Sequence, residues 1–529
     1  MTRARGATLP GLLPGLLACT LPLTPLAAPA FAAPSLPAGF TDATIASGLD
    51  LPTGFAFLPD GRLLVVEQKT ARMKLVDPAD GSVSTVGTVD DIRFDGLERG
   101  LLGVAVDPGW PTRPYVYVHG NDGSTPFVRV SRYALDGVRT GHGPLALDVA
   151  SRYDVIADVP DDNPNHNGGT VRFGPDGMLY AGFGEDEARC MAQDTVSLHG
   201  VILRLDVRRI PDGAGGPAPK GLIAAAGNPF AAHPDSNARL VWAFGLRNPF
   251  RFHIDPVTRH LFVGDVGEAR WEEVDEVPEG GHDFGWPVRE GPEPFQAYDC
   301  QPQLGGPQQW PGDPPIYSYF RPTVTAVVID VGPYRRPAGA SHPFPASYEG
   351  DEFLCDYYQG FVRRLTRSSS GWSIAPPDSG QGDPDNWATG VFHASDWTVG
   401  PDGCLWWCQQ ADDAMDNVSG AIRRIVPPST NDTIPLPESG SIALDPPVPT
   451  PSRGQAALRY VTPEDARARL LVFDMFGRRV RSLPAAPGAQ TVVWDGTGDN
   501  GRRLPAGLYV VRLEVDGRIA AERRLMLLR

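Results

Sequence analysis

The chain has 529 residues, including 60 glycines and 55 prolines, and its formal net charge is −16. This length exceeds what one ordinary hydrophobic core supports. No long apolar-periodic stretch is free of glycine and proline, which excludes a mainly helical protein. The acidity excludes nucleic acid as a partner, because phosphate binding requires basic patches. Lysines occur only at Lys69, Lys74 and Lys220.

Residues 1–33 are predicted to form a signal peptide for export. Two arginines precede an apolar stretch from Leu12 to Leu26, and Ala30-Phe31-Ala32 offers a cleavage site. Several prolines make this stretch a poor transmembrane helix. A lipoprotein signal with lipidation of Cys19 is the less favoured alternative. We therefore expect an exported protein that is periplasmic, secreted or attached to the cell surface.

Five cysteines follow this segment: Cys190, Cys300, Cys355, Cys404 and Cys408. An oxidising compartment permits disulfides, and the odd number leaves at least one thiol unpaired within the chain. Metal binding by Cys404 and Cys408 is disfavoured, because no second pair of Cys or His stands at ligand spacing. Buried thiols or a disulfide explain them better, and the sequence leaves the pairing open.

One unit recurs along the chain: an apolar strand, a turn of the Pro-Asp-Gly type and a second apolar strand. Asp and Gly supply the conformations that such hairpin turns need. The clear copies are residues 54–67, 103–118, 171–184, 252–264 and 397–407, with a further unit at 352–366. Such units match propeller blades, so we predict an all-β chain with a six-bladed β-propeller over residues 40–427. A sandwich or irregular β-protein is the less favoured alternative.

Residues 428–451 are rich in Pro, Ser and Thr, which is typical of a linker. After them, residues 452–529 alternate short strands and turns, which predicts a small immunoglobulin-like β-sandwich. The segment from Trp494 to Tyr509 resembles the FlgD-type immunoglobulin-like domain of the flagellar hook-assembly family and of C-terminal sorting domains. The resemblance implies association with the cell surface or a secretion system. We expect Trp494 and Tyr509 to anchor the core.

Propellers bind ligands at the mouth of their central channel, and three polar segments are candidates for that position. His166, in Asn165–Gly169, could act as a general base, the alternative being a loop histidine that caps a turn. Arg247, in Gly245–Pro249, offers a planar donor for oxyanions, the alternative being a salt bridge within a loop. Residues 264–275 carry many carboxylates, which suit calcium, the alternative being a solvated acidic loop.

These three segments, in this order, resemble the soluble quinoprotein glucose/sorbosone dehydrogenase family. The similarity runs from about Pro52 to Val426. It includes Glu98-Arg99-Gly100-Leu101-Leu102-Gly103, the hairpin at 173–177 and the segment 280–287, GGHDFGWP. The family uses pyrroloquinoline quinone (PQQ) on a six-bladed propeller. The resemblance therefore implies an oxidoreductase that oxidises a small-molecule aldose sugar at C1 with PQQ and calcium, leaving the electron acceptor unidentified.

The resemblance also implies roles for individual residues. His166 would take the proton of the C1 hydroxyl, and Arg247 would stabilise the oxyanion that develops on the quinone. Glu185 stands at the position where the family usually has Asp. The candidate cofactor-binding residues are Glu98, His166, Arg247, Asn248, Tyr358 and His393. The candidate calcium ligands are the carbonyls of Gly267 and Glu268, together with Asp265, Glu272 and Glu273.

Two departures from the family concern the cations that meet the cofactor's carboxylates. Tyr358 stands where the family has a lysine, and residues 393–396 replace an Arg-x-Arg-Asp segment. Each lost charged hydrogen bond is worth about 1.5–3 kcal/mol, which predicts weaker PQQ binding. Arg321, Arg363 and Arg364 are candidates to replace these cations. The alternative function is a non-catalytic exported propeller that binds carbohydrate or protein at the cell surface.

Overall fold

The computed structural model describes most of the chain between residues 33 and 528. The described residues are 33–295, 300, 312–321, 325–411, 418–428, 443–444, 447, 452, 455–463, 466–475, 478–516 and 518–528. The predicted signal peptide lies outside them up to residue 32, as does most of the predicted linker. No helix in these ranges has the length and apolar character needed to cross a bilayer. The helical segments are α1 (Lys220–Ile223), η1 (Arg189–Gln193), η2 (Ala238–Leu240) and η3 (Ala346–Tyr348).

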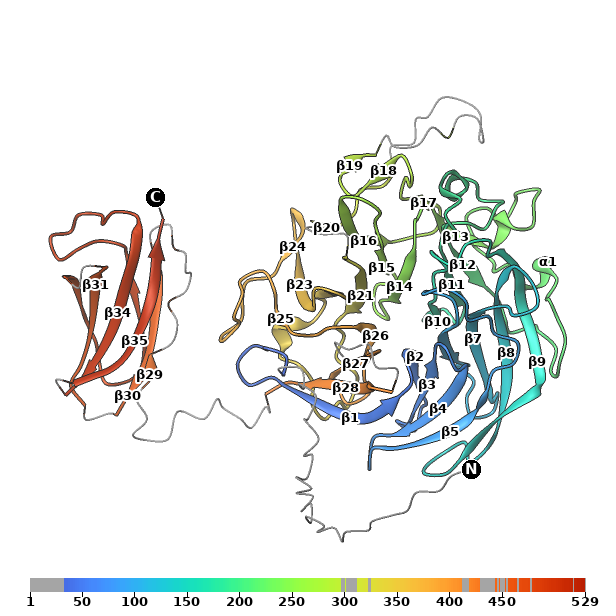
Figure 1. Cartoon of the computed structure of the whole chain (residues 1–529), viewed down its shortest axis with the longest axis horizontal. Coiled ribbons are helices and arrows are strands. Elements are labelled where there is room, and N and C mark those ends of the chain that lie inside the picture. The colour runs from blue at the N-terminus through green and yellow to red at the C-terminus, as the bar shows by residue number, and fades with distance from the viewer. Residues whose placement is uncertain are drawn as a thin grey trace, which may run out of the picture.

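The larger part of the described chain consists of six sheets of four or five strands, arranged around a common centre (Figure 1). The first sheet contains β2 (Pro52–Phe57), β3 (Leu63–Glu67), β4 (Arg72–Asp77) and β5 (Ser82–Thr88). The second contains β6 (Leu101–Val106), β7 (Tyr115–Asn121), β8 (Phe127–Gly137) and β9 (Leu145–Pro160). The third contains β10 (Val171–Phe173), β11 (Leu179–Phe183), β12 (Val201–Leu205), β13 (Val241–Phe244) and β17 (His282–Asp283).

The remaining sheets continue in chain order. The fourth contains β14 (Pro249–Ile254), β15 (Leu261–Asp265), β16 (Trp271–Val277) and β20 (Tyr317–Phe320). The fifth contains β21 (Val328–Pro333), β22 (Glu352–Asp356), β23 (Phe361–Ser368), β24 (Gly371–Ile374) and β25 (Ala388–Thr389). The sixth contains β26 (Ala394–Val399), β27 (Leu405–Gln409), β28 (Gly420–Val426) and β1 (Thr41–Leu49). A hairpin of β18 (Arg289–Glu290) and β19 (Glu293–Pro294) lies outside these sheets.

The first strand completes the last sheet and so closes the ring. β1 pairs antiparallel with β28, from Thr41 opposite Val426 to Leu49 opposite Gly420. The two ends of this part of the chain are therefore joined by a ladder of backbone hydrogen bonds.

The second strand of each sheet explains the apolar runs in the sequence. Every residue of β3, β11, β15, β22 and β27 is buried, because neighbouring sheets cover both faces of these strands. Five of the predicted repeat units are the hairpins between first and second strands, and these hairpins are confirmed. The unit at 352–366 is instead formed by β22 and β23, the second and third strands.

The antiparallel pairing also decides which loops share a rim. A chain that enters a first strand begins at the rim where the second strand ends. Loops that enter a first strand and loops that join second to third strands therefore lie at the same rim. The Pro-Asp-Gly turns lie at the opposite rim, away from the three polar segments.

The C-terminal unit consists of two stacked sheets. One contains β29 (Ala443–Leu444), β30 (Ala456–Thr462) and β33 (Gly488–Trp494). The other contains β32 (Arg479–Pro484), β31 (Ala468–Asp474), β34 (Gly507–Val515) and β35 (Arg518–Leu527). Trp494 and Tyr509 are buried between them with ring centroids 5.6 Å apart, which confirms that they anchor the core. Tyr509 Oη donates to the Pro505 carbonyl at 2.7 Å.

Three titratable residues on β14, β21 and β22 are buried next to one another inside the propeller. His253 Nδ1 lies 2.8 Å from Asp330 Oδ2, and His253 Nε2 lies 2.7 Å from the Trp397 carbonyl. Glu352 is fully buried beside Asp330. Burial, and next the charge of Asp330, raise the pKa of Glu352 well above its ordinary value. The folded protein therefore favours the protonated form of Glu352.

We predict that Glu352→Gln weakens the dependence of stability on pH. The folded wild type retains a proton that the unfolded chain releases above a pKa of about 4.3. Its free energy of unfolding therefore falls as the pH rises above that value, and the glutamine variant lacks this contribution. Urea unfolding between about pH 5 and pH 8 measures the difference. Glu349→Gln, a change of an exposed carboxylate, is the control, and parallel curves for Glu352→Gln and wild type would contradict the prediction.

Candidate functional site

His166 lies in the loop that enters β10 and adopts a left-handed backbone conformation. Its φ is +60°, a region that costs a non-glycine residue energy and that is common at functional sites. The loop packs tightly on the end of β11. A Cβ added to Gly184 would lie 2.0 Å from the His166 carbonyl oxygen, so only glycine fits there. The backbone therefore fixes where the imidazole ring points.

The hydrogen bonds of the His166 ring determine its tautomer. Nε2 lies 2.9 Å from Nη2 of Arg247, and a guanidinium can only donate, so Nε2 accepts. Nδ1 therefore carries the proton and donates it to Oε1 of Glu185 at 2.5 Å. Glu185 is fully buried directly after β11, and its backbone N–H donates to the Arg247 carbonyl at 2.8 Å. This network holds the ring in the state that a general base requires.

Arg247 and Asn248 lie in the loop that enters β14, and one carboxylate fixes their backbone. The N–H groups of Arg247 and Asn248 donate to the two oxygens of Asp265 at 2.8 and 2.7 Å. Arg247 Nη1 donates to the Val266 carbonyl at 2.8 Å, and the guanidinium carbon lies 5.5 Å from the Trp286 ring centroid. Within the described residues, Nε of Arg247 is buried without a hydrogen-bond partner. The Glu268 carboxylate lies 3.8 Å from this nitrogen, so an anionic ligand group at Nε would meet a position already paired with a carboxylate.

Glu98 and Asn248 join the two loops into one site. Glu98 Oε2 accepts the His166 N–H at 2.6 Å and lies 3.4 Å from Asn248 Nδ2. Asn248 Oδ1 in turn accepts the Gly168 N–H at 3.0 Å. The structure therefore brings together four of the predicted residues, Glu98, His166, Arg247 and Asn248.

Tyr358 and His393 lie on loops of the fifth and sixth sheets at the same rim. Their ring centroids are 6.2 Å apart. The three arginines considered as replacement cations each have protein partners of their own. Arg321 donates to Gly267 and Glu272, Arg363 to Tyr317 and Asn386, and Arg364 to Asp378 and Pro376. None of these arginines takes the place of the family's lysine beside Tyr358.

Three buried carboxylates behind the Arg247 loop can hold a metal ion. Oxygens of Asp265, Glu273 and Asp275 lie within 4.8 Å of one another. Burial, and next the repulsion between neighbouring carboxylates, raise the pKa values of Glu273 and Asp275 well above the ordinary range. Burial raises the pKa of Asp265 to about 6. In the part of the chain described, neither Asp275 oxygen has a hydrogen-bond partner. Buried carboxylate oxygens that lack hydrogen-bond partners are suitable ligands for a hard divalent cation such as calcium.

The other candidate calcium ligands lie elsewhere. Glu272 and Glu273 are adjacent on β16 and point to opposite faces. Glu272 pairs with Arg321 and accepts the Val328 N–H at 2.9 Å. The carbonyl of Gly267 accepts from Arg321 at 2.5 Å, and the Glu268 carboxylate lies 3.3 Å from Arg189. Asp275, two residues after Glu273, was not among the predicted ligands, although the two-residue period of a strand places both on one face.

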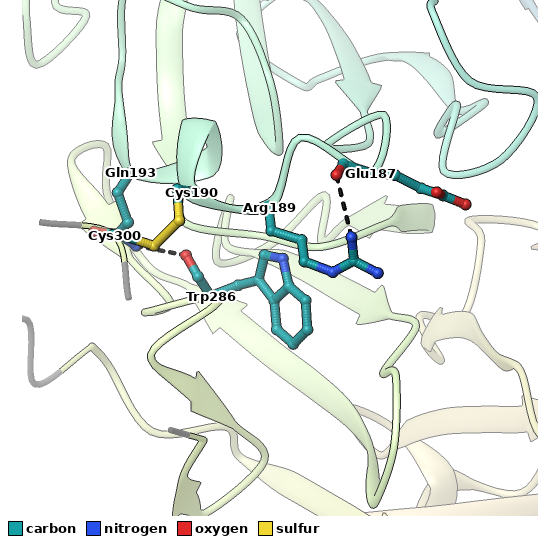
Figure 2. The surroundings of a disulfide bond; sticks show 6 residues. All are labelled: Glu187, Arg189, Cys190, Gln193, Trp286 and Cys300. Atoms are coloured by element: carbon teal, nitrogen blue, oxygen red, sulfur yellow. Dashed lines mark hydrogen bonds between the residues drawn. A yellow bond between two sulfur atoms is a disulfide. The ribbon is translucent and has the colours of Figure 1, made fainter. Parts of the chain in front are cut away.

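A disulfide supports the wall beside Arg247. Cys190 in η1 bonds to Cys300, 110 residues later. Figure 2 shows Gln193, one turn further along, pointing to the Trp286 carbonyl, to which it donates at 2.9 Å. Cys355, Cys404 and Cys408 are buried free thiols. The disulfide and Gln193 thus anchor the segment that carries the Trp286 ring against Arg247.

Comparisons with known proteins find similarity to sugar dehydrogenases. A family model described as glucose/sorbosone dehydrogenase matches residues 49–325, more than half of the chain, and a model of the FlgD Ig-like domain matches residues 450–518. The aldose sugar dehydrogenase YliI of Escherichia coli is 27% identical over 249 residues, covering 45% of this chain and 60% of the relative. The HIPL2 protein of Arabidopsis thaliana is 34% identical over 192 residues, covering 33% of this chain and 26% of the relative.

A solved structure extends the comparison to the fold. The PQQ-bound aldose sugar dehydrogenase of Streptomyces coelicolor is 26% identical, with a TM-score of 0.53, over 74% of this chain and 99% of that one. The alignments with the two curated relatives span less than two thirds of those proteins' own lengths.

We predict that Asp275→Asn removes a calcium-dependent stabilisation. Calcium should raise the Tm of the wild type, because it binds three carboxylates that otherwise repel each other. The asparagine variant relieves part of this repulsion, so it should melt higher than the wild type in chelator and respond little to calcium. Calorimetric melting with calcium and with chelator measures both effects. Glu279→Gln, in an exposed carboxylate just after β16, should behave as the wild type. Equal calcium responses of Asp275→Asn and wild type would exclude this site.

Proposed function

The chain belongs to the glucose/sorbosone dehydrogenase family, and we propose that it oxidises aldose sugars at C1 with PQQ and calcium. The observation that carries the proposal is the tautomer of His166, because the Glu185 and Arg247 contacts leave Nε2 unprotonated. Relatives named as aldose sugar dehydrogenases support the substrate class, and the PQQ-bound structure of one of them supports the cofactor.

In this mechanism His166 accepts a proton at Nε2. The C1 hydroxyl of the sugar takes the position that Arg247 Nη2 now occupies beside Nε2 and transfers its proton there. The imidazolium that forms keeps its Nδ1 hydrogen bond to Glu185, whose charge stabilises it. Glu98 can accept a second sugar hydroxyl at the same rim.

Arg247 and Asn248 are the residues that would hold the reacting end of the quinone. When bound, PQQ supplies the hydride acceptor, and the protein orients and polarises it. Arg247 Nε, which lies 3.8 Å from the Glu268 carboxylate and makes no hydrogen bond to the described residues, would donate to an oxygen that becomes negative. Asp265 keeps both residues in place through their N–H groups.

Calcium would act through Asp265 in this arrangement. Asp265, Glu273 and Asp275 would hold the ion, which would fix the carboxylate that accepts the N–H groups of Arg247 and Asn248. The Gly267 carbonyl, the other candidate to hold calcium, accepts a hydrogen bond from Arg321.

A non-catalytic function in carbohydrate binding is the second candidate. It is favoured by Tyr358 and His393, which occupy the positions of the family's cofactor-binding cations. Since PQQ carries three carboxylates, its affinity separates the two functions.

We predict that the apo-protein binds PQQ in calorimetric titration with calcium present, and that the reconstituted protein reduces a dye with aldoses. Glu185→Gln should lower kcat by about 100- to 10,000-fold, because the neutral amide no longer stabilises the imidazolium that forms on His166. Its affinity for PQQ should stay within a few-fold of the wild type. His142→Gln, a change of an exposed histidine far from the rim, should leave kcat unchanged. A folded sample that fails to bind PQQ and oxidises no aldose would overturn the dehydrogenase proposal.

A further inference from the structure

A small cavity lies at the centre of the propeller, between the first strands of four sheets. Val104 on β6, Arg172 on β10, Arg251 on β14 and Asp396 on β26 contribute to its wall. Its volume is about 10 Å³, which admits one small group and is too small for a sugar or a phosphate ion. Arg172 follows His166 along the chain into β10, so the cavity lies deeper in the propeller than the candidate site.

Two guanidinium groups and one carboxylate meet at this cavity. Arg172 Nη2 donates to Asp396 Oδ1 at 2.5 Å and to the Trp397 carbonyl at 3.0 Å. Arg251 is fully buried, and its Nε lies 3.7 Å from the same Asp396 oxygen. The other oxygen of Asp396 accepts the Phe55 N–H at 3.1 Å. One carboxylate thus serves two cations.

The neighbouring titratable side chains leave one positive charge uncompensated. Burial raises the pKa of the Cys408 thiol to about 12 and lowers the pKa of His119 to about 3, so both groups are neutral. His253 faces the Trp397 carbonyl with Nε2 and Asp330 with Nδ1, so the His253–Asp330 pair holds two protons and has no net charge. The charges of the described groups around the cavity therefore sum to one positive charge.

The excess charge and an unpaired donor call for a negatively charged acceptor. Burial and, to a smaller extent, the positive charge of Arg172 lower the pKa of Arg251 to about 10. Nε of Arg172 is buried without a hydrogen-bond partner in the part of the chain that the structure describes. A guanidinium can only donate, and a buried charge without a counterion costs free energy. An anion supplies both the acceptor and the charge, whereas a water molecule supplies only the acceptor.

We propose that this cavity binds one monatomic anion, such as chloride, between Arg172 and Arg251. The ion accepts hydrogen bonds from the guanidinium groups and removes the excess positive charge. Because the wall of the cavity comes from four different sheets, the bound ion stabilises the closed ring. The inference is independent of the proposed oxidation, since none of the candidate cofactor-binding residues contributes to this wall.

Calorimetric melting of the full-length protein tests this site with sodium chloride, sodium bromide and sodium gluconate at equal ionic strength and with chelator present. Chloride and bromide should raise the Tm until the effect saturates, because they bind only the folded state, whereas gluconate is too large for the cavity. Arg172→Gln removes the excess charge and should abolish the halide response. Arg208→Gln, a change of an exposed arginine that pairs with Asp206, should respond as the wild type.

Asp396→Asn changes the charge in the opposite direction and provides a second test. Without the carboxylate two cations remain uncompensated, so halide should raise the Tm of this variant more than that of the wild type. Anomalous diffraction from wild-type crystals in bromide should show a peak within hydrogen-bond distance of Arg172 and Arg251. Equal halide responses of the wild type and a folded Arg172→Gln variant would overturn the proposal. A cavity that contains water and no bromide would overturn it even if neither variant folds.

Discussion

The buried guanidinium of Arg251 holds the centre of the propeller together. It lies on β14 and donates to carbonyls of three other first strands, those of Thr53, Leu102 and Ser395. Burial lowers its pKa to about 10, and at neutral pH it remains charged and needs all these acceptors. The same side chain supports the site, because a Cβ on Gly169, three residues after His166, would lie 3.0 Å from its Nη1. The histidine loop and the Arg247 loop are thus both built on one fixed cation.

Much of the fold could be predicted because propeller strands impose strong local patterns. Second strands buried on both faces produce the apolar runs, and turn residues separate them. The all-β architecture and the resemblance to the sugar dehydrogenases, with the C-terminal Ig-like domain, are confirmed by the family models and solved structures. The fifth sheet was the weakest prediction. Its first strand, β21, is joined to β22 by a long connection that lacks the recurring turn. The repeat unit predicted there therefore contained only β22 and β23.

The candidate site could be predicted where a short continuous segment contains the functional residue. Glu98, His166, Arg247 and Asn248 were each recognised from a local segment, and the shared rim brings them together. Interactions between distant segments were not accessible in the same way. The bond of Cys190 to Cys300 and the capture of the Gly267 carbonyl by Arg321 join segments with no shared local pattern. Asp275 was not predicted as a calcium ligand, although the alternation of side chains along β16 alone places it on the same face as Glu273.

The family's cofactor-binding cations are replaced in this chain, but the hydrogen bonds around His166 form a complete network. This network contains His166 in a left-handed conformation, the buried Glu185 that orients its ring, and Arg247, whose Nε makes no hydrogen bond to the described residues. The left-handed conformation of His166, with φ +60°, costs stability, and such conformations cluster at functional sites. At the same rim, the partly exposed ring of Tyr358 contacts the buried rings of Tyr357 and His393, where the family has cations. In the proposed function the half around His166 accepts the proton, whereas the half around Tyr358 lacks the cations that bind the family's cofactor.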